Sequence, residues 1–165
     1  MATFKIRQPI LDDAEWITHA CQDTEIQRWT LVPRPYKREH ALGFINNTIN
    51  EAHRWVIEQQ GTNEAVGVVG IHTIDLDTGD AKTGYWIAPW GRRRGAAVHA
   101  LYLVEQFALT IPSINSLSAH IAETNAASRA TASRAGFISM GNAQKPCRDG
   151  ENLVPALTYV KHLTR

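Results

Sequence analysis

The most informative stretch of this sequence reads Gly84-Tyr85-Trp86-Ile87-Ala88-Pro89-Trp90-Gly91-Arg92-Arg93-Arg94-Gly95-Ala96-Ala97. Its aromatic and β-branched beginning favours a strand, and Pro89 ends that strand because proline has no N–H to donate to a sheet. From Ala96 onward the residues are helix formers. Apolar side chains recur there at helical spacing, at Ala97, Leu101, Val104 and Ala108. The stretch therefore predicts a strand, a loop and the start of a helix.

The loop between this strand and this helix has the features of an anion site. The first amide N–H groups of a helix lack carbonyl partners, and the positive end of the helix dipole adds to their attraction for negative charge. Gly95 and Ala96 are small enough to let a phosphate approach the backbone. The guanidinium groups of Arg92, Arg93 and Arg94 are fork-shaped donors for its oxygens. The loop therefore predicts a pyrophosphate site.

Other interpretations of the arginine-rich loop are weaker. Gly95 is followed by neither the Lys nor the Ser or Thr of a Walker loop, and the third glycine of a dinucleotide fingerprint is missing before Gly136. The arginines could also lie on a plain solvated surface or contact nucleic acid. Lys and Arg number 17 against 16 acidic residues, whereas nucleic-acid modules usually carry a marked basic excess. We therefore expect no nucleic-acid partner.

Composition indicates an ordinary soluble globular chain. With 165 residues, 44% hydrophobic and 20% charged, residues 1–165 are expected to form a single domain. No apolar run approaches the ~20 residues that cross a bilayer, and the start of the chain lacks the apolar core of a signal peptide. We expect a cytoplasmic protein without a membrane segment. Cys21 and Cys147 are far apart and the seven histidines are scattered, so no metal site is expected.

Periodicity and turn residues predict alternating strands and helices. Pro9 limits a first edge strand, and the strand over 65–74 is apolar on both faces, so it should be central. The segment Arg28–Tyr36 reads as irregular, either lining a substrate cleft or packing a loop onto the core, and Asn142–Asn152 reads as a loop. The predicted strands are 3–8, 55–58, 65–74, 81–88, 117–122 and 154–162, and the predicted helices are 14–20, 36–53, 96 to the break at 110, and 125–136.

Two motifs in order give the chain a resemblance to a known family. Arg92-x-x-Gly95-x-Ala97 resembles the acetyl-CoA loop of GNAT acetyltransferases, and Asn125-Ala126-Ala127-Ser128 followed by Gly136-Phe137 resembles their second hallmark. The runs Trp55–Glu58 and Gly67–His72 are similar to the branch that includes the ribosomal-protein-alanine N-acetyltransferases. The likeness covers nearly the whole chain.

The resemblance implies a fold and a cofactor. The fold is α/β (α+β): a mixed, mostly antiparallel sheet with about four helices, whose strands 81–88 and 117–123 splay apart to admit the pantetheine arm of acetyl-CoA. Asn125 would touch that arm, and Ser128 would lie near the thioester sulfur. The implied cofactor-binding residues are Ile87, Ala88, Arg92, Arg93, Arg94, Gly95, Ala96, Ala97, Asn125 and Ser128.

The resemblance also implies direct attack of an amine on the thioester, with no acyl-enzyme. Ser128 is then the candidate acid for the leaving thiolate, and backbone N–H groups near Ile87 and Ala88 would polarise the carbonyl. Relatives often carry an acidic residue where this chain has Lys82, so the base is open. The candidates are His72, His120 and Glu58, and either histidine could instead make a structural hydrogen bond.

Protonation arithmetic bears on the acceptor amine. At pH 7 an α-amine with a pKa of ~7.8 is roughly one part in seven neutral, whereas a lysine at ~10.4 is neutral in roughly one part in 2,500. The missing carboxylate therefore favours a protein N-terminus or another amine of low pKa. The alternatives are a small-molecule amine acetyltransferase and a non-catalytic acyl-CoA sensor. Monomer and homodimer are both compatible with the sequence.

Overall fold

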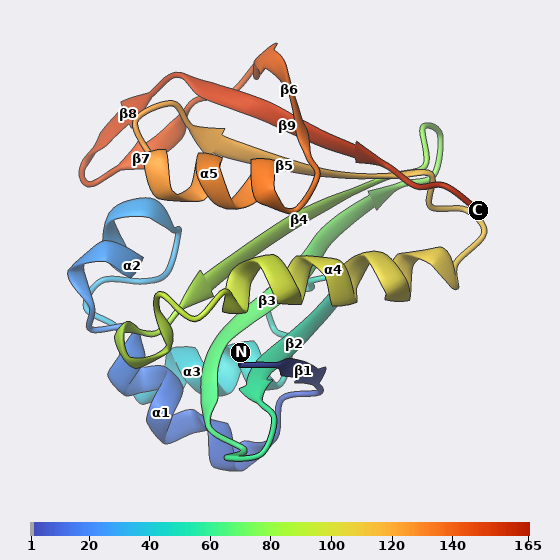
Figure 1. The fold of residues 1–165 in the computed structure, drawn as a ribbon. Coiled ribbons are helices and arrows are strands. Elements are labelled where there is room, and N and C mark those ends of the chain that lie inside the picture. The colour runs from blue at the N-terminus through green and yellow to red at the C-terminus, as the bar shows by residue number, and fades with distance from the viewer. Residues whose placement is uncertain (1) are drawn as a thin grey trace.

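The computed structural model describes residues 2–165 as a sheet with helices on both of its faces (Figure 1). No helix in that range is long and apolar enough to cross a bilayer. The strands are β1 (Phe4–Arg7), β2 (His53–Gln59), β3 (Ala65–Asp75), β4 (Asp80–Ile87), β5 (Ser116–Ala122), β6 (Ile138–Asn142), β7 (Cys147–Asp149), β8 (Asn152–Val154) and β9 (Ala156–His162). The helices are α1 (Ala14–Ala20), α2 (Thr24–Trp29), α3 (Arg38–Ile45), α4 (Ala96–Leu109) and α5 (Ala126–Arg134), with 3-10 turns η1 (Leu11–Asp13) and η2 (Pro89–Gly91).

Seven strands form one mixed sheet, in the order β1-β2-β3-β4-β5-β9-β6. Every neighbouring pair is antiparallel except β4 and β5, which are parallel. Strand β3 lies inside the sheet and β1 at its edge, as the sequence predicts. The separate β7–β8 hairpin lies near α2 (Figure 1).

The parallel pair at the middle of the sheet separates along its length. Asp80 to Lys82 pair with Ser116 to Ser118, and the strands diverge after that (Figure 1). The hydroxyl of Thr83 donates to the carbonyl oxygen of Ser118 at 2.8 Å, which closes the narrow end of the opening. The predicted splay between the two middle strands is therefore confirmed.

Two hydrophobic clusters give the sheet two different faces. Tyr85 and Ile87 of β4 pack into the cluster that contains helix α4, whereas Trp86 and Ala88 pack into the cluster that contains α1 and α3. Alternate strand residues point to opposite faces, so this division holds along β4. We call these faces the α4 face and the α1–α3 face.

Some elements differ from the sequence-based expectation. Arg28 and Trp29 belong to helix α2, which begins where the carboxylate of Asp23 accepts the N–H of Ile26 at 3.0 Å. Helix α3 ends at Ile45, far short of residue 53, because the following turn includes Asn47 at a φ of +57°. Residues 2–165 thus contain five α-helices where about four were expected.

The C-terminal part also contains strands that were missed. The segment 142–152, read as a loop, contains strand β7 and the first residue of β8, and β6 precedes it. Strands β7 and β8 have only three residues each, too few to show a period, and β6 has five residues that are all exposed. The hairpin is held by tertiary contacts, including a 2.7 Å ion pair between Arg28 and Asp149.

Candidate functional site

The N-terminus of α4 follows a left-handed glycine. Gly95 has a φ of +77°, and the first helical hydrogen bond runs from the N–H of His99 to the carbonyl oxygen of Gly95 at 3.0 Å. The N–H groups of Ala96, Ala97 and Val98 come before that first bond, so they have no carbonyl partner within the helix, as in the first turn of any helix. A Cβ at Gly95 would find nothing within 4 Å, so the backbone there is open to a ligand. The φ value makes any substitution at Gly95 strained as well.

The three arginines of the loop have different surroundings. Arg92 forms a 2.5 Å ion pair with Asp23, and Arg94 forms a 2.9 Å ion pair with Glu64. Arg93 is exposed at a φ of +62°. The outer two arginines therefore fix the ends of the loop against the body of the protein, and Arg93 points its charge to solvent.

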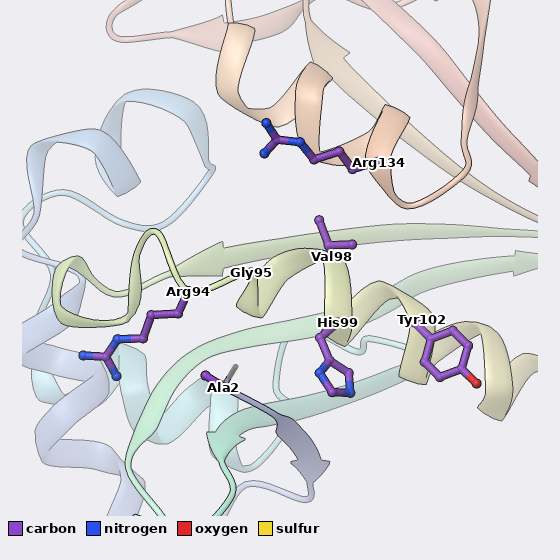
Figure 2. A pocket seen from close by; sticks show the side chains of 7 residues that line it. All are labelled: Ala2, Arg94, Gly95, Val98, His99, Tyr102 and Arg134. Atoms are coloured by element: carbon purple, nitrogen blue, oxygen red, sulfur yellow. The ribbon is translucent and has the colours of Figure 1, made fainter.

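A cavity of about 440 Å³ lies beside this helix start, lined in part by Gly95, Val98 and Tyr102 of α4 (Figure 2). Arg134 reaches over it from α5, on the opposite side from His99 and Tyr102 (Figure 2). Sequence reasoning missed Arg134, because it lies in the last turn of a different helix. Arg134 thus lines the same cavity as Gly95 and Val98 at the start of α4, and a guanidinium beside a helix start is a feature of anion sites.

Asn125 and Ser128 meet the sheet at the wide part of the splay. The side-chain oxygen of Asn125 accepts the N–H of Ser128 at 3.2 Å, so Asn125 is the N-cap of α5. The Oγ atom of Ser128 lies 3.1 Å from the hydroxyl oxygen of Tyr85, which projects from β4. Burial raises the pKa of Tyr85, and the hydroxyls of Ser128 and Thr131 partly oppose that rise. Sequence reasoning used Tyr85 only as a strand former and missed this contact.

The two candidate backbone donors on β4 point in different directions. The N–H of Ala88 donates to the carbonyl oxygen of Val66 at 2.8 Å, so it is occupied by the β3 side. In an antiparallel ladder consecutive residues alternate in their direction of hydrogen bonding. The N–H of Ile87, opposite Gly67, is therefore directed to the β5 side, into the splay.

Two candidate bases lie on the α1–α3 face. His72 lies so close to Gly84 that a Cβ on that glycine would meet its Nε2 at 2.3 Å, and its Nδ1 lies 2.7 Å from the Glu51 carboxylate. On β5, His120 shares a face with Ser118, whose hydroxyl bonds to Asp80. Because Lys82 is opposite Ser118, His120 falls level with Gly84 across the splay. Burial, and then the charge of Lys82, lower the pKa of His120.

Glu58 is placed elsewhere. Its carboxylate forms ion pairs with Lys5 at 3.0 Å and with Arg7 at 2.7 Å, at the β1–β2 edge of the sheet. Burial acts to raise the pKa of Glu58, but these two cations outweigh it and the pKa is lowered. Arg7 also bridges to Asp13. The structure therefore does not bring Glu58 together with Ser128 or the two histidines.

A helix start preceded by an open left-handed glycine thus lies beside an opened sheet, with the hydroxyls of Tyr85 and Ser128 on one face and the imidazoles of His72 and His120 on the other. The family model described as "Acetyltransferase (GNAT) domain" matches residues 4–138, so the chain belongs to the GNAT acetyltransferases. The chain is thus an acyltransferase that takes its acetyl group from acetyl-CoA, and this chemistry uses no metal.

Several known proteins are similar to this chain. The N-acetyltransferase YoaA of Bacillus subtilis (strain 168), itself uncharacterised, is 26% identical over 141 residues, covering 82% of this chain and 80% of YoaA. The microcin C7 self-immunity acetyltransferase MccE, solved with acetyl-CoA and AMP, has a TM-score of 0.84 at 21% identity over 97% of this chain and 92% of its own. The ribosomal L7/L12 α-N-protein acetyltransferase RimL, solved with coenzyme A, has a TM-score of 0.82 at 16% identity, covering 98% and 94%.

Proposed function

We propose that residues 1–165 act as one N-acetyltransferase domain that acetylates a primary amine of low pKa, such as a protein N-terminus. Acetyl-CoA would supply the activated acetyl group as a thioester. The observation that carries this proposal is the division of the splay: the hydroxyls of Tyr85 and Ser128 lie on its α4 face, and the imidazoles of His72 and His120 lie on its α1–α3 face. Acetyl-CoA entering from the α4 face and the acceptor amine entering from the α1–α3 face would meet in the opening between β4 and β5.

The α4 face provides the groups that suit a diphosphate. The free N–H groups of Ala96 to Val98 and the charges of Arg93 and Arg134 would hold its oxygens. Arg92 and Arg94 would keep the loop in place through Asp23 and Glu64. This assignment keeps every loop residue expected from the sequence in the site and adds Arg134.

The hydroxyl pair would handle the leaving group. Thiols have a pKa of ~8.5, so a thiolate needs only modest help to leave. Ser128 would donate its proton to the sulfur and draw on the hydroxyl of Tyr85, 3.1 Å away, to replace it. The N–H of Ile87 would stabilise the negative charge that develops on the carbonyl oxygen. Asn125 would hold the start of α5 in the orientation that directs Ser128 towards β4.

Groups on the α1–α3 face would accept the proton that the amine loses. The Glu51 carboxylate fixes the orientation of the His72 ring and places a proton on Nδ1, which leaves Nε2 free to accept one. We assign His72 as the base, acting directly or through one water, with His120 across the opening as a second proton acceptor. Glu58 takes a structural role, because two cations hold its charge.

An α-amine fits this apparatus better than a lysine side chain. Imidazole is a weak base, and an α-amine requires far less help than a lysine to become neutral at pH 7. The solved neighbours include both a protein N-terminal acetyltransferase and the spermidine N-acetyltransferase of Vibrio cholerae, solved with coenzyme A and spermine, so the fold alone does not separate these acceptors.

Thiol release from acetyl-CoA tests the proposal. Three acceptors are compared. The first is a lysine-free peptide amide with a free α-amine, the second is an N-acetylated peptide amide whose lysine side chain is its one amine, and the third is spermidine. We expect the free α-amine to react fastest. A higher rate with lysine or spermidine would overturn the acceptor assignment, and coenzyme binding without thiol release on any amine would identify a sensor instead.

A further inference from the structure

A second cavity, of about 590 Å³, lies between two segments that are distant in sequence. Residues 31–34, which follow α2, line one side, and the β7–β8 hairpin lines the other. Hydrogen bonds join the two sides directly: the N–H of Gly150 donates to the carbonyl oxygen of Arg28 at 2.9 Å, and Arg28 pairs with Asp149 at 2.7 Å. Contacts within the fold therefore hold the two sides of the cavity in place.

The hairpin connects this cavity to the reaction opening. The second carboxylate oxygen of Asp149 accepts the hydroxyl of Thr124 at 2.7 Å, directly before the α5 cap at Asn125. At its other end the hairpin packs against the sheet, where β7 contacts β5, one of the two strands that bound the splay. Gly150, which lines the cavity, is therefore one residue from the contact between Asp149 and the segment that carries Asn125 and Ser128.

The charges around the cavity are unbalanced. Arg34 donates to the backbone carbonyls of Gln27 and Gly150, and Arg148 donates to the carbonyl of Thr30 at 3.3 Å. Within residues 2–165 neither guanidinium forms an ion pair with a carboxylate, in contrast to Arg28 beside them. Glu151 is the one acidic side chain among the lining residues. Two fixed positive charges against one negative charge favour an anionic occupant.

We propose that this cavity selects the acceptor: it binds the acidic side chain that follows the reactive amine in an N-terminal peptide. The inference rests on the proposed function for the position of the amine. Arg148 and Arg34 would supply fork-shaped donors to the carboxylate, and the exposed side chains of Leu31 and Leu153 would cover its aliphatic stem. The same charges disfavour a polycation such as a polyamine.

The test compares three acceptors that differ only in the second residue: the amides of Ala-Glu, Ala-Gln and Ala-Lys. We expect kcat/KM to fall from the acidic to the neutral to the basic amide, with a total range of about tenfold or more, the typical worth of a charge-assisted hydrogen bond. Arg148→Gln should remove most of the acidic preference and leave the neutral amide unchanged. Arg148→Glu should make the basic amide the better acceptor.

The matched control is Arg38→Gln, which removes an exposed guanidinium from α3 on another part of the surface and should leave all three rates unchanged. Equal rates for the three amides, or a preference for Ala-Lys in the unmodified protein, would overturn the inference. If no amide releases thiol, the proposed function fails, and calorimetric titration of the coenzyme-bound protein then decides the inference by itself. Tighter binding of Ala-Glu amide than of Ala-Lys amide, lost in Arg148→Gln, supports it, and equal binding contradicts it.

Discussion

The hydroxyl oxygen of Tyr85 lies 3.1 Å from Oγ of Ser128, so β4 and α5 are joined by one hydrogen bond at the mouth of the splay. If the two hydroxyls protonate the leaving thiolate together, Tyr85→Phe and Ser128→Ala should each lower kcat at pH 7. We expect about a tenfold loss, below the usual range for proton transfer, because a thiolate is a fair leaving group.

The double variant shows whether Tyr85 and Ser128 donate the proton together or act independently. Groups that act through one hydrogen bond lose little more together than singly, so Tyr85→Phe with Ser128→Ala should also be about tenfold slower. The coenzyme affinity of Tyr85→Phe, measured by calorimetry, serves as the control and should not change. Losses that multiply in the double variant would show that the pair does not work as a unit.

The contact between His72 and Glu51 predicts a particular pH dependence of activity. His72→Gln and Glu51→Gln should lower kcat/KM for an α-amine acceptor by about tenfold or more at pH 7. The defect should shrink towards pH 9, because an α-amine with a pKa of ~7.8 is then neutral without help. His162→Gln, which alters an exposed histidine on β9, is the control. A defect of the same size at both pH values would contradict the role of His72 as a base.

Arg134 is the member of the proposed coenzyme site that only the structure identifies. Arg134→Gln should weaken coenzyme A binding about tenfold, measured by calorimetry, because a guanidinium facing a phosphate is replaced by a neutral group. Arg165→Gln is a suitable control, since Arg165 bonds to the carbonyl oxygens of Ala108 and Ile111 at the far end of α4. Unchanged affinity in Arg134→Gln would remove Arg134 from the site.

The cap of α5 makes a prediction about stability. Asn125→Ala removes the acceptor for the N–H of Ser128 and should cost about 1 kcal/mol, whereas Asn125→Asp keeps an acceptor and should stay close to the unmodified protein. In a chain of this size the loss corresponds to a Tm lower by about 2–4 °C. Equal melting temperatures for the Ala and Asp variants would mean that the cap contributes nothing.

The ion pairs of Arg7 predict acid sensitivity. Burial acts to raise the pKa of Asp13, but hydrogen bonds from Arg7, Ile10 and Trp16 outweigh it and hold the pKa below its ordinary value of 3.8. A lowered carboxylate pKa means that the folded state binds fewer protons than the unfolded chain. Its stabilisation is therefore complete above about pH 5 and lost as the pH falls through the folded-state pKa.

Asp13→Asn tests that linkage by urea unfolding. At pH 7 the variant should be about 2 kcal/mol less stable, since Arg7 keeps Glu58 as a partner. The difference from the unmodified protein should narrow at pH 3, where the native carboxylate begins to be protonated. A constant difference across that range would show that the charge of Asp13 is not what stabilises the protein.

The sequence predicts the parts of this fold that depend on local pattern. The strand, loop and helix around Gly95 follow from residue preferences, and the cap at Asn125 follows from its place before a helix. Helix α2 was missed because its six residues contain only two large apolar side chains, Ile26 and Trp29, too few to define a period. The β7–β8 hairpin was missed because contacts such as Arg28 with Asp149 link residues distant in sequence.

Prediction of the candidate site from the sequence is limited in the same way. The proposed coenzyme loop is continuous in sequence, so its residues could be named without a structure, whereas Tyr85 and Arg134 enter the proposed site through contacts between separate elements. Glu58 was a reasonable candidate from its strand position, but sequence could not show that Lys5 and Arg7 lie beside it across the β1–β2 ladder. The partner of a charged group is decided by tertiary packing, which residue preferences do not contain.

A crystal structure of the protein with coenzyme A would show where the diphosphate and the sulfur atom bind. We expect diphosphate oxygens on the N–H groups of Ala96 to Val98, and the sulfur atom between β4 and β5 within hydrogen-bonding distance of the Ser128 hydroxyl. A diphosphate bound away from the start of α4, or a sulfur outside the splay, would contradict the proposal.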